Sequence, residues 1–287
     1  MIEIASLFVY SAPVALAALG ETVNQKGGSL NIGIEGTMLA GCFFGMATSL
    51  STGSPWLGIL AGTGVGIALT LLQALFVLKL AIDQVVVGTA INLLALGLTS
   101  TLFRSQYGDS GKLLSVPELP KFWGIDVVIL LLLVLAPLTA WLISRSRWGL
   151  ALRAAGEYPN AAEAAGYSVL KLRLQAMLIG GALAGLAGAY LSLGIAGSFA
   201  TNMTAGRGFV AIAMVTFGRW KPMWVFGACL LVGYADSLQY VFQSKGIGVP
   251  FQLLLALPYI LALLVLVGVG RGSAAPAALG KPFQRSA

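Results

Sequence analysis

The sequence predicts an all-α, polytopic membrane protein, and three observations support this fold class. Apolar runs long enough to cross roughly 30 Å of bilayer hydrocarbon recur along the whole chain. Only 9% of the residues are charged, and the mean hydropathy is +0.90. The alternating ten-residue pattern of a membrane β-barrel is absent. We therefore expect about nine transmembrane segments in a lipid bilayer.

The expected segments follow one another with short connections. In order they are Ile4–Gly20, Asn31–Leu50, Trp56–Leu78, Gln84–Phe103, Ile125–Ile143, Val169–Leu191, Gly206–Phe217, Met223–Phe242 and Phe251–Val269. The first segment is expected to be retained in the mature protein. Glu3 precedes it, whereas a cleaved signal peptide carries a basic cluster at that place. Glycines spaced four residues apart, such as Gly181 and Gly185, predict close packing of the helices.

The basic residues predict which loops face the cytoplasm. Membrane proteins collect Lys and Arg in inner loops, and most of the 17 basic residues fall inside when the stretch 144–175 is placed there. This bias accounts for the net charge of +7 without a nucleic-acid partner. It predicts an outer N-terminus and an inner C-terminus. Residues 1–270 would form the membrane domain, and residues 271–287 a flexible cytoplasmic tail.

Two segments carry interruptions in corresponding places. Gly206–Phe217 is short for a crossing, since a helix of that length spans only about 18 Å, and a non-helical stretch near Gly197–Ala205 is expected before it. Glycines between residues 27 and 33 similarly precede or interrupt the segment Asn31–Leu50. The two segments run in opposite directions in the predicted topology, so they point to an inverted repeat and a translocation path. Loose packing of Gly-rich helices is the alternative.

Polar residues inside the apolar runs are candidates for the pore or for the broken helices, because ionisable groups are costly in a bilayer. Glu35 and Asp236 are the acids well inside such runs, and at helical spacing Asn31 shares a face with Glu35. Asn92 and Asn202 complete the set. The alternative is structural: Glu35, near the cytoplasmic end, would cap backbone amides at an interruption.

No catalytic, metal or cofactor site is expected in the chain itself. It has no histidine, and both of its cysteines lie inside apolar runs. It lacks the Gly-x-x-x-x-Gly-Lys-Ser/Thr motif of nucleotide-hydrolysing proteins, and no nucleophile–base pair stands out. Two isolated acids are a poor ion-coupling cluster. Active transport would therefore draw its energy from another chain; a carrier or channel acting alone and a membrane enzyme are the weaker alternatives.

The stretch 144–175 is the one polar interruption of the chain, with seven charged residues between two apolar runs. Pro159 suits the first turn of a helix, and Asn160–Ala165 reads as a short Ala-rich helix that stops at Gly166. Small side chains on a short helix form a smooth knob that can enter a groove of a soluble partner. An ordinary amphipathic loop helix is the alternative.

This stretch resembles the coupling region of ABC importer permeases of the branched-chain amino acid, ribose and nucleoside type. The residues Arg153, Gly156, Glu157, Ala161, Ala162 and Gly166 are similar to that family's Arg-Ala-x-Gly-Glu-x-x-x-Ala-Ala-x-x-x-Gly pattern. Segments 28–36, 83–92, 202–209 and 217–222 resemble other elements of the family. The likeness covers nearly the entire chain and is closest to the nucleoside permeases.

The resemblance implies the partners and the substrate. The chain would pair with a second, related permease in the inner membrane of a bacterium, with an extracytoplasmic substrate-binding protein above and two ATPase domains, which bind ATP and Mg, below. Arg153 and Glu157 would position the knob, and Ala161 and Ala162 would form its contact face with an ATPase domain. Nucleosides or related purines are the expected substrates, with riboflavin and simple sugars as alternatives.

Overall fold

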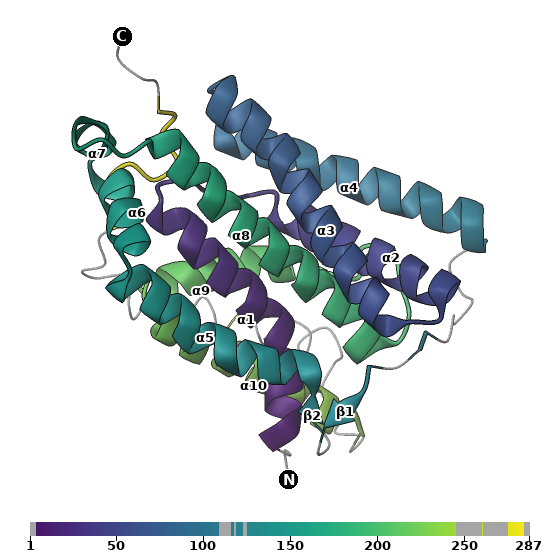
Figure 1. The fold of residues 1–287 in the computed structure, drawn as a ribbon. Helices are drawn as coiled ribbons and strands as arrows, with labels where there is room; N and C mark the ends of the chain where they lie inside the picture. The colour runs from purple at the N-terminus through teal and green to yellow at the C-terminus, as the bar shows by residue number, and fades with distance from the viewer. Residues whose placement is uncertain are drawn as a thin grey trace.

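The computed structural model describes residues 4–108, 116–117, 119–122, 125–244, 260 and 275–283. Apart from one two-stranded antiparallel hairpin, the elements in this part of the chain are helices, two of which continue as π-helical turns, η1 and η2 (Figure 1). They are α1 Ile4–Lys26, α2 Ile34–Thr52, α3 Pro55–Ala74, η1 Leu75–Lys79, α4 Gln84–Tyr107, β1 Lys121–Phe122, β2 Ile125–Asp126, α5 Val127–Arg145, α6 Arg147–Glu157, α7 Pro159–Ala164, α8 Val169–Tyr190, η2 Leu191–Ala196, α9 Arg207–Phe217 and α10 Pro222–Ser244.

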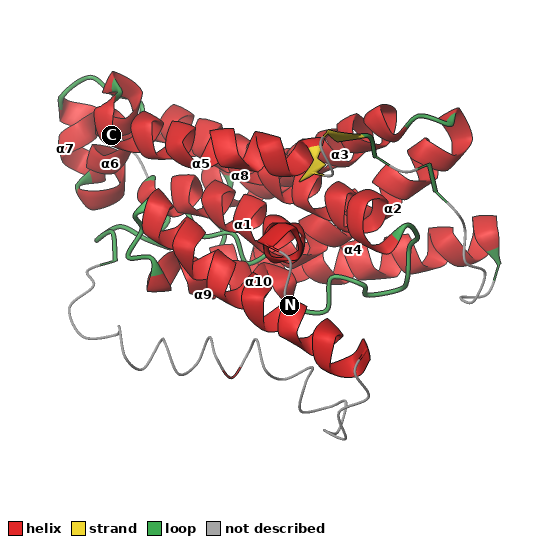
Figure 2. Cartoon of the chain, turned by 90° about the horizontal axis from the view of Figure 1, so that it is seen from below, coloured by secondary structure: helices red, strands yellow, loops and turns green. Residues whose placement is uncertain are grey.

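Helices α1, α2 and α8 form the centre of the bundle. Figure 2 shows α1 between a row made by α5, α8 and α3 and a row made by α9 and α10, and α1 packs against α5, α8, α9 and α10. α8 packs in turn against α2 and α3. In the middle of the central helices, side chains on every side are buried or half-buried, including the buried Leu16, Met38 and Ala184. A helix that is buried all round has no polar face, so its sequence is apolar without a helical period.

Glycine allows the central helices to approach backbone to backbone. A Cβ on Gly188 of α8 would collide with the carbonyl oxygen of Met38 in α2, and a Cβ on Gly185 would collide with the carbonyl oxygen of Gly62 in α3. Such contacts without side chains are typical of membrane helices, where packing and not the hydrophobic effect joins the helices. The tight bundle predicted from the glycine spacing is therefore present.

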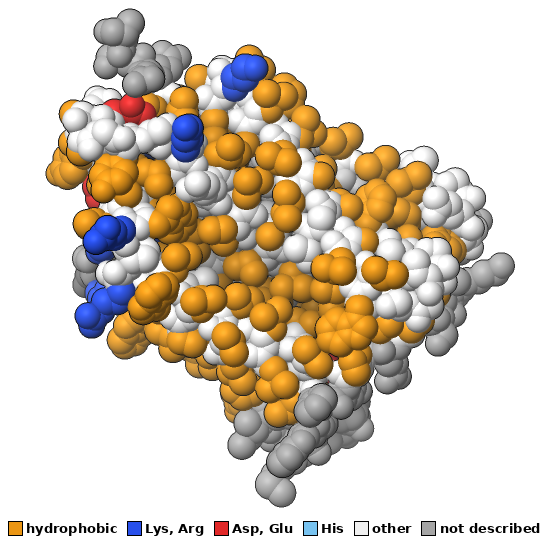
Figure 3. All heavy atoms as spheres, viewed as in Figure 1, with side chains coloured by type: hydrophobic (Ala, Val, Ile, Leu, Met, Phe, Trp, Pro, Cys, Tyr) orange, Lys and Arg blue, Asp and Glu red, His pale blue; other side chains and the backbone are white. Residues whose placement is uncertain are grey.

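The outer helices turn large apolar side chains away from the bundle. Leu60 of α3, Leu93 of α4 and Val134 of α5 are 61–71% exposed. Figure 3 shows apolar side chains over most of this face, with Lys and Arg side chains along its left and upper edges. An apolar surface of this extent would be covered by lipid in a membrane protein.

Five described helices are long and apolar enough to cross a membrane, which fits a multi-pass protein. They are Ser6–Lys26, Pro55–Lys79, Gln84–Tyr107, Val127–Arg145 and Val169–Ala196. The ninth predicted segment, Phe251–Val269, lies outside the described residues. Nine crossings and an outer N-terminus therefore stay predictions.

Two expectations about the start of the chain are wrong. The first helix does not end at Gly20 but continues to Lys26, because the polar residues of its last turns are buried and hydrogen-bonded. Asn31 does not share a helix face with Glu35, because α2 begins only at Ile34 and Asn31 lies in the non-helical connection before it.

Residues 275–283, part of the tail expected to be flexible, are hydrogen-bonded to the rest of the protein. The backbone N–H of Ala278 donates to the carbonyl oxygen of Gly156 at 2.9 Å, and that of Gly280 donates to the carbonyl oxygen of Gly28 at 3.1 Å. In Figure 1 this yellow segment lies beside α6, α7 and the start of α8. Its backbone donates hydrogen bonds to α6 and to the connection between α1 and α2, both far away in the sequence, and composition alone does not indicate these contacts.

Candidate functional site

The connection between α1 and α2, residues 27–33, is a true interruption of the helices, and side chains from α4 hold it in place. The side chain of Asn92 accepts a hydrogen bond from the N–H of Gly36 at 2.7 Å and donates one to the carbonyl oxygen of Ile32 at 2.9 Å. The carbonyl oxygen of the Gln84 side chain accepts from the N–H of Leu30 at 2.6 Å. These bonds replace the backbone partners that an interruption removes inside a bilayer.

Glu35, in the first turn of α2, binds the start of α9. Its two carboxylate oxygens accept hydrogen bonds from the N–H groups of Gly206 and Gly208, each at 2.7 Å. A Cβ on Gly208 would lie 2.7 Å from the backbone of Glu35, so a glycine is needed for this approach. The N-termini of two helices thus meet at one carboxylate, where a negative charge is favoured by both helix dipoles. Glu35 therefore caps amides at an interruption, and the amides belong to the second broken helix.

The two helices lead from this meeting point toward opposite ends of α8. After α9, the indole N–H of Trp220 donates to the side-chain oxygen of Gln25 at 2.7 Å. Gln25 belongs to the last turn of α1, and this end of α1 packs near the start of α8. α2 leads instead toward Gly58 of α3, which lies beside Leu193 beyond the end of α8. The opposite directions of the two segments across a membrane stay a prediction.

Glu21 is a central residue that the sequence reasoning missed. It is fully buried in α1 and accepts hydrogen bonds from the side chains of Asn24 at 3.1 Å and Gln25 at 2.9 Å, and from the N–H of Asn31 at 3.0 Å. Through Gln25 it also connects to Trp220 after α9. It was missed because the first apolar run was ended at Gly20. The available signal was helical spacing, which places Glu21 and Gln25 on one face.

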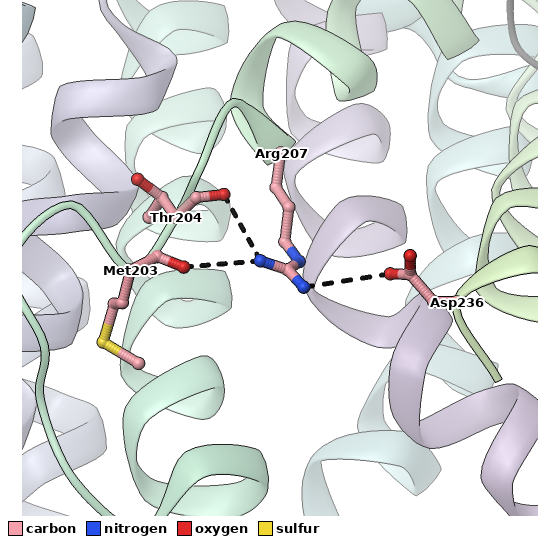
Figure 4. A network of polar contacts seen from close by, with 4 residues as sticks. All are labelled: Met203, Thr204, Arg207 and Asp236. Carbon is pink, nitrogen blue, oxygen red and sulfur yellow. Dashed lines mark hydrogen bonds and ion pairs between the residues drawn. The ribbon is translucent and has the colours of Figure 1, made fainter. Parts of the chain in front are cut away.

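Arg207 and Asp236 form a charged pair (Figure 4), and both residues line a cavity. The Arg207 Nη2 atom lies 3.9 Å from the Asp236 Oδ2 atom, and Nη1 donates to the carbonyl oxygens of Met203 at 3.3 Å and Thr204 at 3.4 Å. Both residues line a cavity of about 260 Å³ between η2, the connection before α9, and α10. The other lining residues are Tyr10, Leu191, Ile195, Ala196, Ser198, Ala200 and Met203.

The pore and broken-helix residues predicted from sequence therefore do not form one site in the structure. Glu35 and Asn92, together with the backbone of Asn31, hold the two interruptions, and Asp236 lies at the cavity. Asn202 is exposed in the connection 197–206, with a left-handed backbone (φ +60°), and does not line the cavity. The stretch expected to be non-helical before the half-helix is present.

The helices α6 and α7 form the polar unit expected between residues 144 and 175. The hydroxyl of Ser146 caps α6 by accepting from the N–H of Gly149 at 2.8 Å. α7 begins at Pro159, and the chain leaves it through Gly166, whose φ of +86° suits glycine. The start of α8 is joined to this unit, because Glu163 accepts from the N–H of Val169 at 3.0 Å.

Ala161 and Ala162 do not share one exposed face. Ala161 is exposed, whereas Ala162 is only 3% exposed and packs among Leu152, Val169 and their apolar neighbours. The expectation that both alanines face outward is wrong for Ala162, because adjacent helical residues point about 100° apart. Glu157 is exposed and accepts from the N–H of Ala277 at 3.2 Å, and the Arg153 side chain donates to the carbonyl oxygen of Gly149 at 3.4 Å.

No metal-ligand cluster occurs in the part of the chain that the structure describes. Groups of three or more His, Cys, Asp or Glu side chains do not come together there. Cys42 and Cys229 are buried as free thiols in the apolar core.

The chain matches known membrane permeases over nearly its whole length. The family model described as "Branched-chain amino acid transport system / permease component" matches residues 3–270. The guanosine ABC transporter permease protein NupQ of Bacillus subtilis is 34% identical, over 98% of this chain and 96% of its own length.

Two further relatives differ in the substrate that their names give. The nucleoside ABC transporter permease protein NupC of Lactococcus lactis is 31% identical, over 99% of this chain and 97% of its own. A putative glucose ABC transporter permease protein of Haloferax volcanii, TsgC13, is 35% identical, over 80% of this chain and 74% of its own.

Proposed function

We propose that this chain, which belongs to the branched-chain amino acid transport permease family, is a membrane subunit of an ATP-driven importer for nucleosides or related purines. The similarity to the guanosine permease NupQ along almost the entire length of both chains carries the proposal. The interrupted helices that meet at Glu35 support it, since broken helices inside the membrane are typical of transport paths.

The proposed importer contains further chains. Bacillus subtilis has two guanosine permease proteins similar to this chain, NupQ and NupP, and a second related permease is therefore the proposed partner here. Two ATPase domains would bind ATP and Mg on the cytoplasmic side, and an extracytoplasmic protein would deliver the substrate. The bacterial inner membrane is the proposed location. The exposed surface of α7, together with α6, would receive the movement of an ATPase domain.

The substrate is tested by reconstituting the chain with these partners in vesicles. We expect guanosine or another nucleoside to stimulate both ATP hydrolysis and uptake. Stimulation by glucose and not by nucleosides would instead favour a sugar importer, the second candidate, which the resemblance to TsgC13 supports. Uptake that continues with hydrolysis-deficient ATPase partners would contradict the importer and indicate an ion-coupled carrier.

The contact with the ATPase domain is tested at Ala161, on the exposed side of α7. Ala161→Asp is expected to abolish uptake, because a charge buried without a partner typically costs about 3–5 kcal/mol. Co-purification should show the ATPase lost from a permease that is still present in the membrane. Ala161→Ser is the matched control and should keep uptake. Normal uptake and normal ATPase recovery with Ala161→Asp would place the contact elsewhere.

The proposed path for the substrate includes the cavity at Arg207 and Asp236. A carboxylate accepts from the N–H groups of a purine, and a guanidinium donates to its oxygen and nitrogen acceptors. Asp236→Asn is expected to raise the KM of nucleoside uptake about ten-fold, because a hydrogen bond to a charged group contributes about 1.5–3 kcal/mol. Initial uptake rates over a range of nucleoside concentrations measure this. An unchanged KM would remove Asp236 from the path.

A further inference from the structure

The C-terminal segment 275–283 contacts two regions that the proposed transport cycle must connect. On one side, its Ala277 and Ala278 N–H groups donate to Glu157 and Gly156 at the end of α6. On the other side, its Gly280 N–H donates to the carbonyl oxygen of Gly28, in the interruption before α2. The segment thus bridges the α6–α7 unit and the interruption.

Arg173 completes the bridge from α8. Its side chain is 1% exposed, its Nε donates to the carbonyl oxygen of Gly27 at 3.1 Å, and its Nη1 donates to the carbonyl oxygen of Lys281 at 2.9 Å. One planar guanidinium therefore bonds the interruption and the C-terminal segment at the same time, which the single ammonium of a lysine cannot reproduce in this geometry.

The α6–α7 unit also touches the interruption directly. A Cβ on Gly156 would collide with the carbonyl oxygen of Lys26, the last residue of α1. Beyond the interruption, Glu35 at the start of α2 bonds the start of α9. A continuous series of contacts therefore leads from α7 to both broken helices.

We propose that residues 275–283 form a C-terminal clamp that makes the α6–α7 unit and the interruption before α2 move together, with Arg173 as the positioning residue. The clamp transmits displacement of α7 by an ATPase domain to the helices that meet at Glu35. This rests on the proposed function, since it assigns a step in the coupling of ATP hydrolysis to transport. Without the clamp, hydrolysis continues and less substrate moves per ATP.

The test measures substrate uptake per ATP hydrolysed by the complete importer in vesicles. Gly280→Pro removes the N–H that bonds Gly28 and cannot adopt the φ of +73° at this position. Gly280→Asn is the matched control, because asparagine keeps the N–H and tolerates this backbone conformation. In a second pair, Arg173→Lys is the test variant and Lys171→Arg is its matched control, because Lys171 is exposed on the same helix. We expect Gly280→Pro and Arg173→Lys to lower uptake per ATP about five-fold or more, as allosteric coupling energies typically allow, and both controls to match the wild type.

The outcomes separate the clamp from the proposed function. Unchanged uptake per ATP in Gly280→Pro and in a chain shortened to residue 274 would overturn the clamp while the wild type still imports. Failure of both of these variants to assemble with the ATPase would also overturn it, since the segment would then act in folding. A wild-type complex without ATP-driven nucleoside uptake would contradict the proposed function itself.

Discussion

Glu35→Ala is expected to abolish uptake and to lower the stability of the permease by about 3–5 kcal/mol. The carboxylate is 8% exposed and accepts hydrogen bonds from both Gly206 and Gly208. Removing it leaves two backbone N–H groups without their acceptor inside the protein, at about 1–3 kcal/mol each, and also removes the negative charge that faces two helix N-termini. Thermal unfolding of the purified permease and nucleoside uptake into cells measure the two effects.

The loss of stability and of uptake should increase as fewer side-chain oxygens remain at residue 35 to accept from Gly206 and Gly208. Glu35→Gln keeps one oxygen and turns an amide NH₂ toward the second N–H, so we expect a smaller loss than with alanine. Asp83 is the matched control, because it also accepts from two backbone amides, Val85 and Val86, but at the exposed start of α4. Asp83→Asn should change stability by less than about 1 kcal/mol, since asparagine caps helices well. A Glu35→Ala permease with normal stability and uptake would show that the two broken helices do not depend on this carboxylate.

Gly188→Val is expected to prevent the central bundle from forming. A Cβ at this position would collide with the carbonyl oxygen of Met38, and the backbone of α2 cannot rotate away as a flexible side chain could. Overpacking usually costs about 1–3 kcal/mol and more where backbone must move. Because α8 also packs on α1 and α3, a shift of α8 would disturb the whole centre. The amount of permease recovered from membranes as a monodisperse species measures the effect.

The matched control is Gly97→Val in α4, where a Cβ meets nothing within 4 Å. Both substitutions place the same side chain in an apolar helix, so they differ only in the space available. We expect Gly97→Val to yield wild-type amounts of active permease. Equal yields from Gly188→Val would mean that the close approach of α2 and α8 is not needed for assembly.

Local chemistry allowed several features to be predicted from sequence. Proline at 159 and glycine at 166 predicted the ends of the short helix α7, because each residue has its own backbone preference wherever it lies in a fold. The shortness of the apolar run after residue 206 predicted the short helix α9, because a helix of that length spans only about 18 Å. The side that Ala162 faces was predicted wrongly, since a six-residue helix carries no apolar period and its buried side depends on Leu152 and Val169.

Sequence alone established that the chain is helical and apolar and that its polar stretch lies between residues 144 and 175, and it predicted where two helices are interrupted. These features follow from composition and from the backbone preferences of single residues. Three contacts came only from the tertiary structure: Glu35 bonds the start of α9, Glu21 bonds the connection before α2 and is linked through Gln25 to Trp220 after α9, and residues 275–283 bridge α6 and that same connection. Each of these contacts joins groups far apart in the chain or depends on the exact end of a helix. Hydrogen bonds form only within about 3 Å, and the sequence alone does not specify such distances.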